Sequence, residues 1–185
     1  RTGLRLAQQW RVRLGLPGKR EYDEVLRKLS PLPVEEGVYV SWENIERMWT
    51  SYNWEHPALV GAYGMLPGDG VDIPTMGRTL AKVHAEWKLG ETWGWDFPML
   101  AMCAARLGDP ERAVEYLLDY PAFDFDPHGL VGGGRAPFPY FPGNGGLLYA
   151  VAMMAAGWDG APAGDAPGFP EKGWVVRSEG LRRAL

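Results

Sequence analysis

The chain of 185 residues contains a single cysteine, Cys103, so no disulfide bond can form within it. Cys103 lies in an apolar run at a helical position, which predicts a buried and inert thiol. Only three histidines are present, and they lack the spacing of metal ligands, so no metal site is predicted. The glycines at 132–134 are not followed by lysine and a hydroxyl residue, so they form no phosphate-binding loop, and no cofactor is predicted.

Basic residues and long apolar runs are also scarce. Lys and Arg number 19 against 23 Asp and Glu, which gives a formal charge of −4 and a pI near 5.4. This balance lacks the basic footprint of nucleic-acid-binding proteins. No stretch approaches the roughly 20 apolar residues that a membrane-spanning helix needs. We therefore expect neither nucleic acid as a partner nor a membrane span.

Aromatic residues, by contrast, are abundant, and nine tryptophans are more than a helical scaffold needs. Trp93 and Trp95 stand beside Asp96 in the segment TWGWDFP at 92–98, directly before an apolar run. Proline favours the first turn of a helix and aspartate accepts from free amides there, so Asp96 is predicted at a helix start. Flat rings and a carboxylate are what a sugar site needs. The alternative is that the tryptophans are core residues and Asp96 is only a cap.

Hydrophobic periodicity and turn residues predict an all-α chain of antiparallel helical hairpins, joined by long loops rich in aromatic, glycine and proline residues. A helix that ends in glycine and a next helix that starts at or near proline occur at 14–17 and again at 107–110. A closed ring of hairpins fits better than an open solenoid, because the period of about 34 residues of one solenoid type is absent. Helices are expected at 3–14, 19–29, 41–49, 57–63, 74–88, 96–107, 110–119 and 145–156, extended pieces at 37–40 and 174–176, and a long functional loop at 120–146.

Four blocks, HPALVGAYGMLPGD, TWGWDFP, ARLGDPERAVEYLL and PYFPGNGGLLYAVAMM, follow one another between residues 56 and 154. Together they resemble the C-terminal half of six-hairpin, or (α/α)6-toroid, glycosidases, and the inverting α-L-fucosidase family in particular. Trp95–Asp96–Phe97–Pro98 is also similar to a sugar-pocket motif of trehalases. The tail from GWDG to PGFPEKGW looks like an uncharacterised bacterial branch of these glycosidases.

This resemblance implies an incomplete (α/α)6 toroid. Residues 1–157 would be the C-terminal portion of a glycosidase catalytic domain, and residues 158–185 a tail with a short strand. The remaining N-terminal part of the same polypeptide would complete the ring, and a periplasmic or secreted location would follow. Because fewer helices are readable than a closed ring needs, the first and last helices are expected to expose apolar flanks.

One position departs from the fucosidase pattern. In the matching loop of that family, the residue two before the asparagine is an aspartate that helps to activate water, whereas Pro142–Gly143 precede Asn144 here. The base role must therefore move, with Asp96 as the first candidate and Glu55, Asp124 and Asp126 as others. The candidate sugar-binding residues are Trp93, Trp95, His56, His128, Tyr140 and Asn144, whereas His84 is interpreted as a surface or packing residue.

The sequence thus predicts part of a glycoside hydrolase that cleaves an oligosaccharide or polysaccharide substrate. Glycoside cleavage normally needs two carboxyl groups, and the resemblance places the general acid upstream, so the chain alone is expected to be inactive. A sugar epimerase or polysaccharide lyase on the same toroid, in which histidine moves protons, stays open, as does a non-catalytic helical scaffold. In the enzymes, one concave surface is expected to hold Trp93, Trp95, Asp96, His56 and Asn144.

Overall fold

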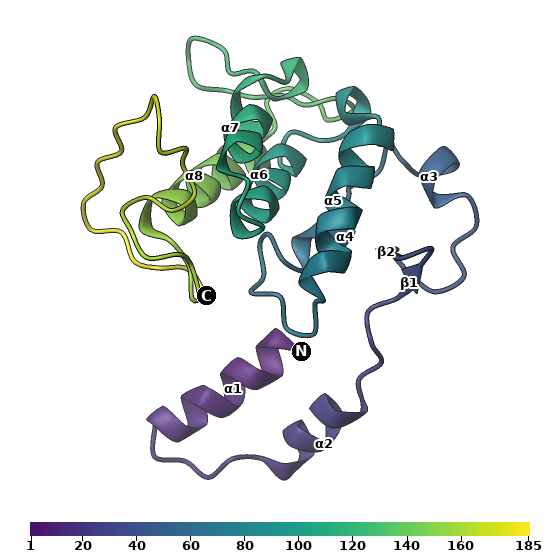
Figure 1. Ribbon diagram of the computed structural model, residues 1–185, viewed down its shortest axis with the longest axis vertical. Helices are drawn as coiled ribbons and strands as arrows, with labels where there is room; N and C mark the ends of the chain where they lie inside the picture. Colours follow the sequence, from purple (N-terminus) through teal and green to yellow (C-terminus); the bar gives the residue numbers. More distant parts are fainter.

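The computed structural model describes residues 1–185, and it is mostly helical (Figure 1). Eight α-helices and one two-stranded antiparallel hairpin make up the regular structure. No helix is both long and apolar enough to cross a membrane. The elements are α1 (Thr2–Arg13), α2 (Arg20–Lys28), β1 (Val34–Glu35), β2 (Val38–Tyr39), α3 (Met48–Ser51), α4 (Ala58–Gly61), α5 (Ile73–Glu86), α6 (Asp96–Arg106), α7 (Pro110–Leu118) and α8 (Phe141–Ala156), with short 3-10 turns at Leu89–Glu91 and Pro121–Phe123.

Helix α6 is the centre of the molecule. All 11 of its residues are buried, and it packs against α4, α5, α7 and α8. A helix that is apolar on every side is stable only when neighbours cover it completely, and the small side chains of Ala101, Ala104 and Ala105 allow those neighbours to come close. Cys103 is fully buried, and burial raises the pKa of its thiol. The prediction of a buried thiol is therefore confirmed.

The predicted helix boundaries around α6 and α7 are confirmed. Gly108 adopts the left-handed conformation that ends a helix, with φ of 83°. The side chain of Asp109 then accepts from the backbone N–H of Arg112 at 3.0 Å, and Pro110 occupies the first turn of α7. The chain therefore reverses within a few residues, so α6 and α7 form a tightly packed hairpin.

Two other predicted helices have different bounds in the structure. The helix expected at 41–49 is wrong, because only Met48–Ser51 is helical and Asn44 and Arg47 take left-handed conformations. The N-cap of α3 is Arg47 instead of Ser41, whose backbone amide donates to the sulfur of Met48 at 3.4 Å. Helix α8 begins at Phe141 instead of residue 145, because a proline in the first turn needs no hydrogen-bond partner.

The tail 158–185 folds back onto the ends of α6 and α8 instead of forming a strand. The strand expected at 174–176 is wrong, since no segment pairs with it and Val175 is 85% exposed. Within the tail, Trp158 and Ala184 form an isolated bridge, and the amide of Gly168 donates to the carbonyl oxygen of Met154 in α8 at 3.0 Å. Arg106, from the last turn of α6, donates to the carbonyl oxygen of Leu185 at 2.5 Å and to that of Gly64 at 3.1 Å. These bonds hold the end of the tail against the body.

Helices α1 and α2 form an arm below the body (Figure 1). Neither helix has a buried residue, and Gln8 joins them by donating to Asp23 at 2.8 Å. The arm is attached through Asp69, whose carboxylate accepts from Thr2 at 2.6 Å and pairs with Arg5 at 2.8 Å. A cavity of about 510 Å³ separates the arm from the body, so this attachment depends on polar contacts more than on packing.

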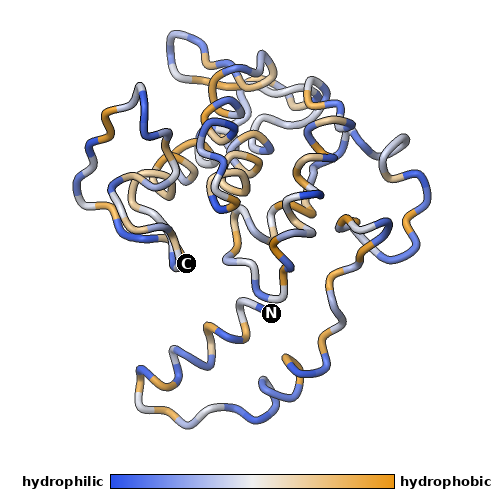
Figure 2. The backbone as a smooth tube through the Cα atoms, in the orientation of Figure 1, coloured by the Kyte–Doolittle hydropathy of each residue, from blue (hydrophilic) through white to orange (hydrophobic).

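Apolar side chains are exposed on the first and last helices, as predicted. Trp10 and Val12 in α1 are 56% and 70% exposed, and Leu14, directly after the helix, is 66% exposed. In α8, Leu148 and Val151 are exposed as well. The hydropathy colouring in Figure 2 shows apolar residues along both helices. Helix α8 contains no charged residue, so one face of an almost wholly apolar helix meets solvent.

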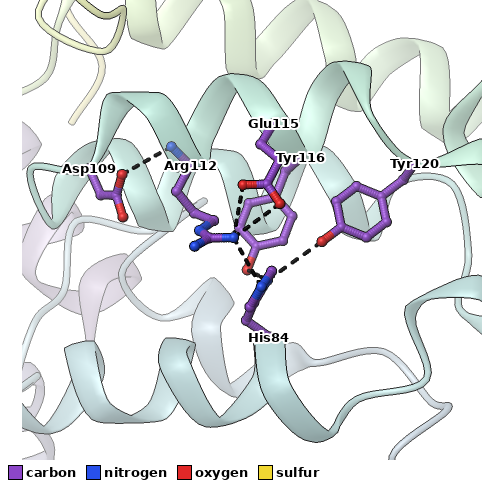
Figure 3. A network of polar contacts seen from close by, with 6 residues as sticks. All are labelled: His84, Asp109, Arg112, Glu115, Tyr116 and Tyr120. Atoms are coloured by element: carbon purple, nitrogen blue, oxygen red, sulfur yellow. Dashed lines mark hydrogen bonds and ion pairs between the residues drawn. The ribbon is translucent and has the colours of Figure 1, made fainter.

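A polar cluster between α5 and α7 centres on His84 (Figure 3). Arg112 donates to the imidazole Nε2 at 2.9 Å and to both carboxylate oxygens of Glu115 at 3.0 and 2.8 Å. A guanidinium only donates, so Nε2 of His84 must accept and Nδ1 must carry the ring proton toward Tyr116 and Tyr120. His84 is thus a half-buried packing residue that holds α7 against α5, as the sequence predicted.

We predict that Asp69→Asn releases the arm without unfolding the body. An amide cannot pair with the Arg5 guanidinium as a carboxylate does, and α1 has no buried side chain to compensate. Hydrogen exchange of the α1 and α2 amides should accelerate, while exchange in α6 stays the same. Asp119→Asn, at an exposed position, is the matched control. Equal exchange in α1 for both variants would contradict this attachment.

Candidate functional site

Four segments meet at the N-terminal end of α6. They are the segment 52–56, the segment 91–95, the loop 131–140 and the first turn of α8. The approach is close, since a Cβ added at Gly94 would collide with the carbonyl oxygen of Gly132, and one at Gly143 would collide with Val131. Asp96 and Asn144 therefore lie at the same end of the helices, as predicted.

Asp96 is the first residue of α6, at the helix start that the sequence predicted. Its side chain is completely buried, and both of its oxygens are engaged. One oxygen, Oδ2, accepts from the backbone N–H of Trp93 at 2.9 Å. The other, Oδ1, lies 2.9 Å from Nδ1 of His56. Asp96 therefore offers no oxygen to solvent in this structure.

Burial raises the pKa of the Asp96 carboxyl to about 6. Loss of hydration is the largest cause, because a charge is disfavoured where water cannot reach it. The backbone N–H of Trp93 and the neighbouring His56 act in the opposite direction. The negative charge of Glu55 adds a smaller increase. The carboxyl thus gives up its proton about two pH units above its ordinary range.

His56 is the member of the pair that meets solvent. Its side chain is 30% exposed, and its Nε2 makes no hydrogen bond within the protein. The ring packs between Trp93, at 4.8 Å between centroids, and Trp95, at 5.1 Å. A buried carboxylate that holds one nitrogen of an imidazole fixes the ring and supports proton transfer at the other. The exposed group able to move a proton here is therefore an imidazole, whereas the sequence favoured Asp96 itself.

Trp93 and Tyr140 extend this aromatic surface. Their ring centroids lie 5.8 Å apart. The pKa of the Tyr140 hydroxyl is raised, first by burial and then by the charge of Asp96. The indole N–H of Trp93 is buried without a hydrogen-bond partner. Buried donors are nearly always paired, so this N–H is a polar group that the fold itself leaves unsatisfied.

A second contact at this end of the helices joins Arg135, Trp54 and Glu91. The Arg135 guanidinium lies 4.0 Å from the Trp54 ring centroid and forms an ion pair with Glu91 at 2.8 Å. A cation over an indole face is attracted by the ring's quadrupole. No local sequence pattern predicts this contact, because it pairs an arginine after three glycines with a tryptophan far upstream.

Several candidate residues lie outside the Asp96–His56 pair. Asp126 accepts from the backbone N–H groups of His128 and Leu130 at 2.9 and 2.8 Å, so it shapes its own loop. His128 and Asp124 are exposed on that loop. The side-chain amide of Asn144 donates to the carbonyl oxygen of Gly129 at 2.7 Å. The hydrogen bonds of Asp126 and Asn144 are made to the loop itself, and they do not join these residues to Asp96 or His56.

The predicted concave surface is also less developed than expected. The main cavities of the structure are lined by other residues, including the cavity beside the arm and one of about 340 Å³ between His84 and Arg112. Asp96 and His56 line none of these. The site is therefore a surface pair of imidazole and buried carboxylate, enclosed on its sides by aromatic rings.

No protein-family model, curated protein or solved structure matches this chain.

We predict that Asp96 makes the stability of the protein fall as pH rises. Its pKa is raised on folding from 3.8 to about 6, so its stabilising contribution is complete below pH 4 and is lost as pH passes 6. One pKa unit corresponds to about 1.4 kcal/mol, so the loss is on the order of 3 kcal/mol. Urea unfolding from pH 4 to 7 should show it as a difference between wild type and Asp96→Asn.

The asparagine variant is a suitable reference for this measurement. Asparagine retains an oxygen that accepts from the Trp93 amide, and it carries no charge at any pH. Titration of the carboxyl groups that do not interact with Asp96 cancels in the difference between the two proteins. Parallel stability curves for wild type and variant would show that Asp96 titrates normally.

Proposed function

We propose that this chain carries the acid–base centre of a carbohydrate-active enzyme, and that the reaction is hydrolysis of a glycosidic bond. The observation that carries the proposal is the exposed imidazole of His56, held by the buried Asp96 and flanked by Trp93 and Trp95 at 4.8 and 5.1 Å. Aromatic rings stack on the C–H faces of sugars, and a positioned imidazole transfers protons near neutral pH.

In this proposal His56 is the general base. Its Nε2 removes a proton from the water molecule that attacks the anomeric carbon, and Asp96 stabilises the imidazolium that forms. General-base catalysis of this kind contributes about 10²–10⁴-fold to a rate. Glu55 precedes His56 and is half-exposed, so it is the nearest carboxyl group in sequence that meets solvent. The general acid belongs, as the resemblance implies, to another part of the enzyme.

Further aromatic side chains support a saccharide as the substrate. Trp42 and Tyr52 form an exposed edge-to-face pair with centroids 6.0 Å apart, and Tyr52 belongs to the same short segment as His56. Contiguous exposed apolar surface is a feature of ligand-binding grooves. The ligand class that best fits flat exposed rings together with a few polar groups is a sugar.

The same proposal includes the (α/α)6 toroid. The exposed apolar flanks of α1 and α8 support it, because further helical hairpins packed against them would remove these side chains from water. The neighbouring hairpins would then complete the site and make the surface around His56 deeper.

A sugar epimerase or polysaccharide lyase is the second candidate. It is favoured by one observation, namely that the exposed proton carrier is an imidazole while the carboxylate is buried. Both reactions abstract a proton from carbon and consume no water. Product analysis in isotope-labelled water separates the candidates, since hydrolysis places one labelled oxygen in the product and the others place none.

We predict that saccharide binding depends on Trp93 and that turnover depends on His56. On a glycan array, Trp93→Ala should lose the binding that the wild type shows, because the stacking ring is removed. In the full-length enzyme, His56→Gln should retain binding and lower turnover at least 100-fold, as expected when a general base is lost. Asp119→Asn, at an exposed position outside the site, is the control. A wild-type chain that binds no saccharide would contradict the proposal and favour a helical scaffold.

A further inference from the structure

Nδ1 of His56 has two neighbours with opposite requirements. It lies 2.9 Å from Oδ1 of Asp96 and 2.9 Å from the indole Nε1 of Trp95. An ionised carboxylate only accepts a hydrogen bond, and an indole N–H only donates one. A ring nitrogen carries either a hydrogen or a lone pair. Nδ1 can therefore satisfy Asp96 or Trp95, but not both at once.

The two choices place the ring proton on different nitrogens. When Nδ1 carries the hydrogen and donates to Asp96, Nε2 has a free lone pair and can act as a base. When Nδ1 accepts from Trp95, the hydrogen of the neutral ring lies on Nε2, which can then act as an acid. Because Nε2 is the nitrogen that meets solvent, the choice made at Nδ1 decides what the site offers to a ligand.

We propose that Trp95 is a positioning residue that sets the tautomer of His56. Its indole N–H and the carboxylate of Asp96 compete for the same ring nitrogen, Nδ1. This role is separate from the stacking role that the sequence assigns to Trp95. Its consequence for catalysis rests on the proposed function, whereas the tautomer itself is a property of this chain.

The two tautomers of His56 are connected by the following proton movements. After Nε2 has taken a proton from a reacting group, the ring is an imidazolium with hydrogens on both nitrogens. The ring becomes neutral again by losing one of these two protons. Loss of the Nε2 proton restores the base whose Nδ1–H donates to the ionised Asp96, whereas loss of the Nδ1 proton to solvent leaves Nδ1 free to accept from Trp95. Glu55 and Tyr140 are the other titratable groups whose charges couple to Asp96.

Nitrogen NMR of protein labelled in its three histidines measures the tautomer directly, because protonated and bare ring nitrogens differ in chemical shift. At pH 8, Trp95→Phe should shift His56 toward the form with hydrogen on Nδ1, since the competing donor is gone. Asp96→Asn should shift it the opposite way, because the amide nitrogen then donates to Nδ1. A net hydrogen bond of about 0.5–1.5 kcal/mol corresponds to a change in tautomer ratio of about twofold to tenfold.

Trp93→Phe is the matched control. Its ring also contacts His56, at 4.8 Å, but its indole N–H has no bond to the imidazole, so the tautomer ratio should stay at the wild-type value. His84, whose Nε2 accepts from Arg112, supplies an internal reference in every spectrum and reports that the fold is intact. An unchanged His56 ratio in Trp95→Phe, or a shift in the same direction as Asp96→Asn, would overturn the proposal.

The wild type offers a second measurement that needs no substitution in the site. The Trp95 indole proton should lie downfield while Nδ1 accepts from it, and it should move upfield on acidification, when the ring takes up a second proton and Nδ1 becomes a donor. If the chemical shift of the Trp95 indole proton does not change when His56 is protonated, the proposal is overturned, even if Trp95→Phe fails to fold. Both measurements stand without a substrate, so they remain informative if glycoside hydrolysis is disproved.

Discussion

The complete burial of α6 is the constraint on which the rest of the structure depends. A helix whose 11 residues are all inaccessible must be covered by α4, α5, α7 and α8 at once, and these contacts fix where the surrounding loops meet. The same burial takes the carboxyl group of Asp96, at the first position of α6, out of water. A carboxylate in that environment persists only with strong partners, which here are the Trp93 amide and the imidazole of His56.

This arrangement divides the chemistry between two residues. Asp96 is inaccessible and holds the ring, whereas His56 carries an open nitrogen at the surface between two indoles. A site that keeps a buried ionisable group lowers the stability of the fold at neutral pH, since burial raises the pKa of Asp96 to about 6. Groups with strongly perturbed pKa values beside specific partners are more frequent at functional sites than elsewhere. That tendency, together with the aromatic surroundings, favours a catalytic role over a purely structural cap.

The sequence predicted those parts of the fold that local chemistry decides. The glycine and proline at 108–110 stop one helix and start the next, and the apolar run after Asp96 becomes the central helix. The helix predicted at 41–49 does not form before Met48, because Asn44 and Arg47 take left-handed conformations that no local pattern in this segment indicates. In the site, the aromatic residues and Asp96 were found by composition. The pairing of Asp96 with His56 was not predicted. The two residues are 40 positions apart, and their contact depends on how α4 and α6 pack.

We propose that a buried Asp96 carboxyl holds His56 for proton transfer, and the titration of that carboxyl is the direct test. Carbon NMR of the side-chain carboxyl group of Asp96 follows its ionisation without reference to any substrate. The account predicts a midpoint near pH 6, where burial outweighs the Trp93 amide and His56. A midpoint at the ordinary value of 3.8 would mean that water reaches Asp96, and it would contradict the assignment of the exposed proton carrier to His56 alone.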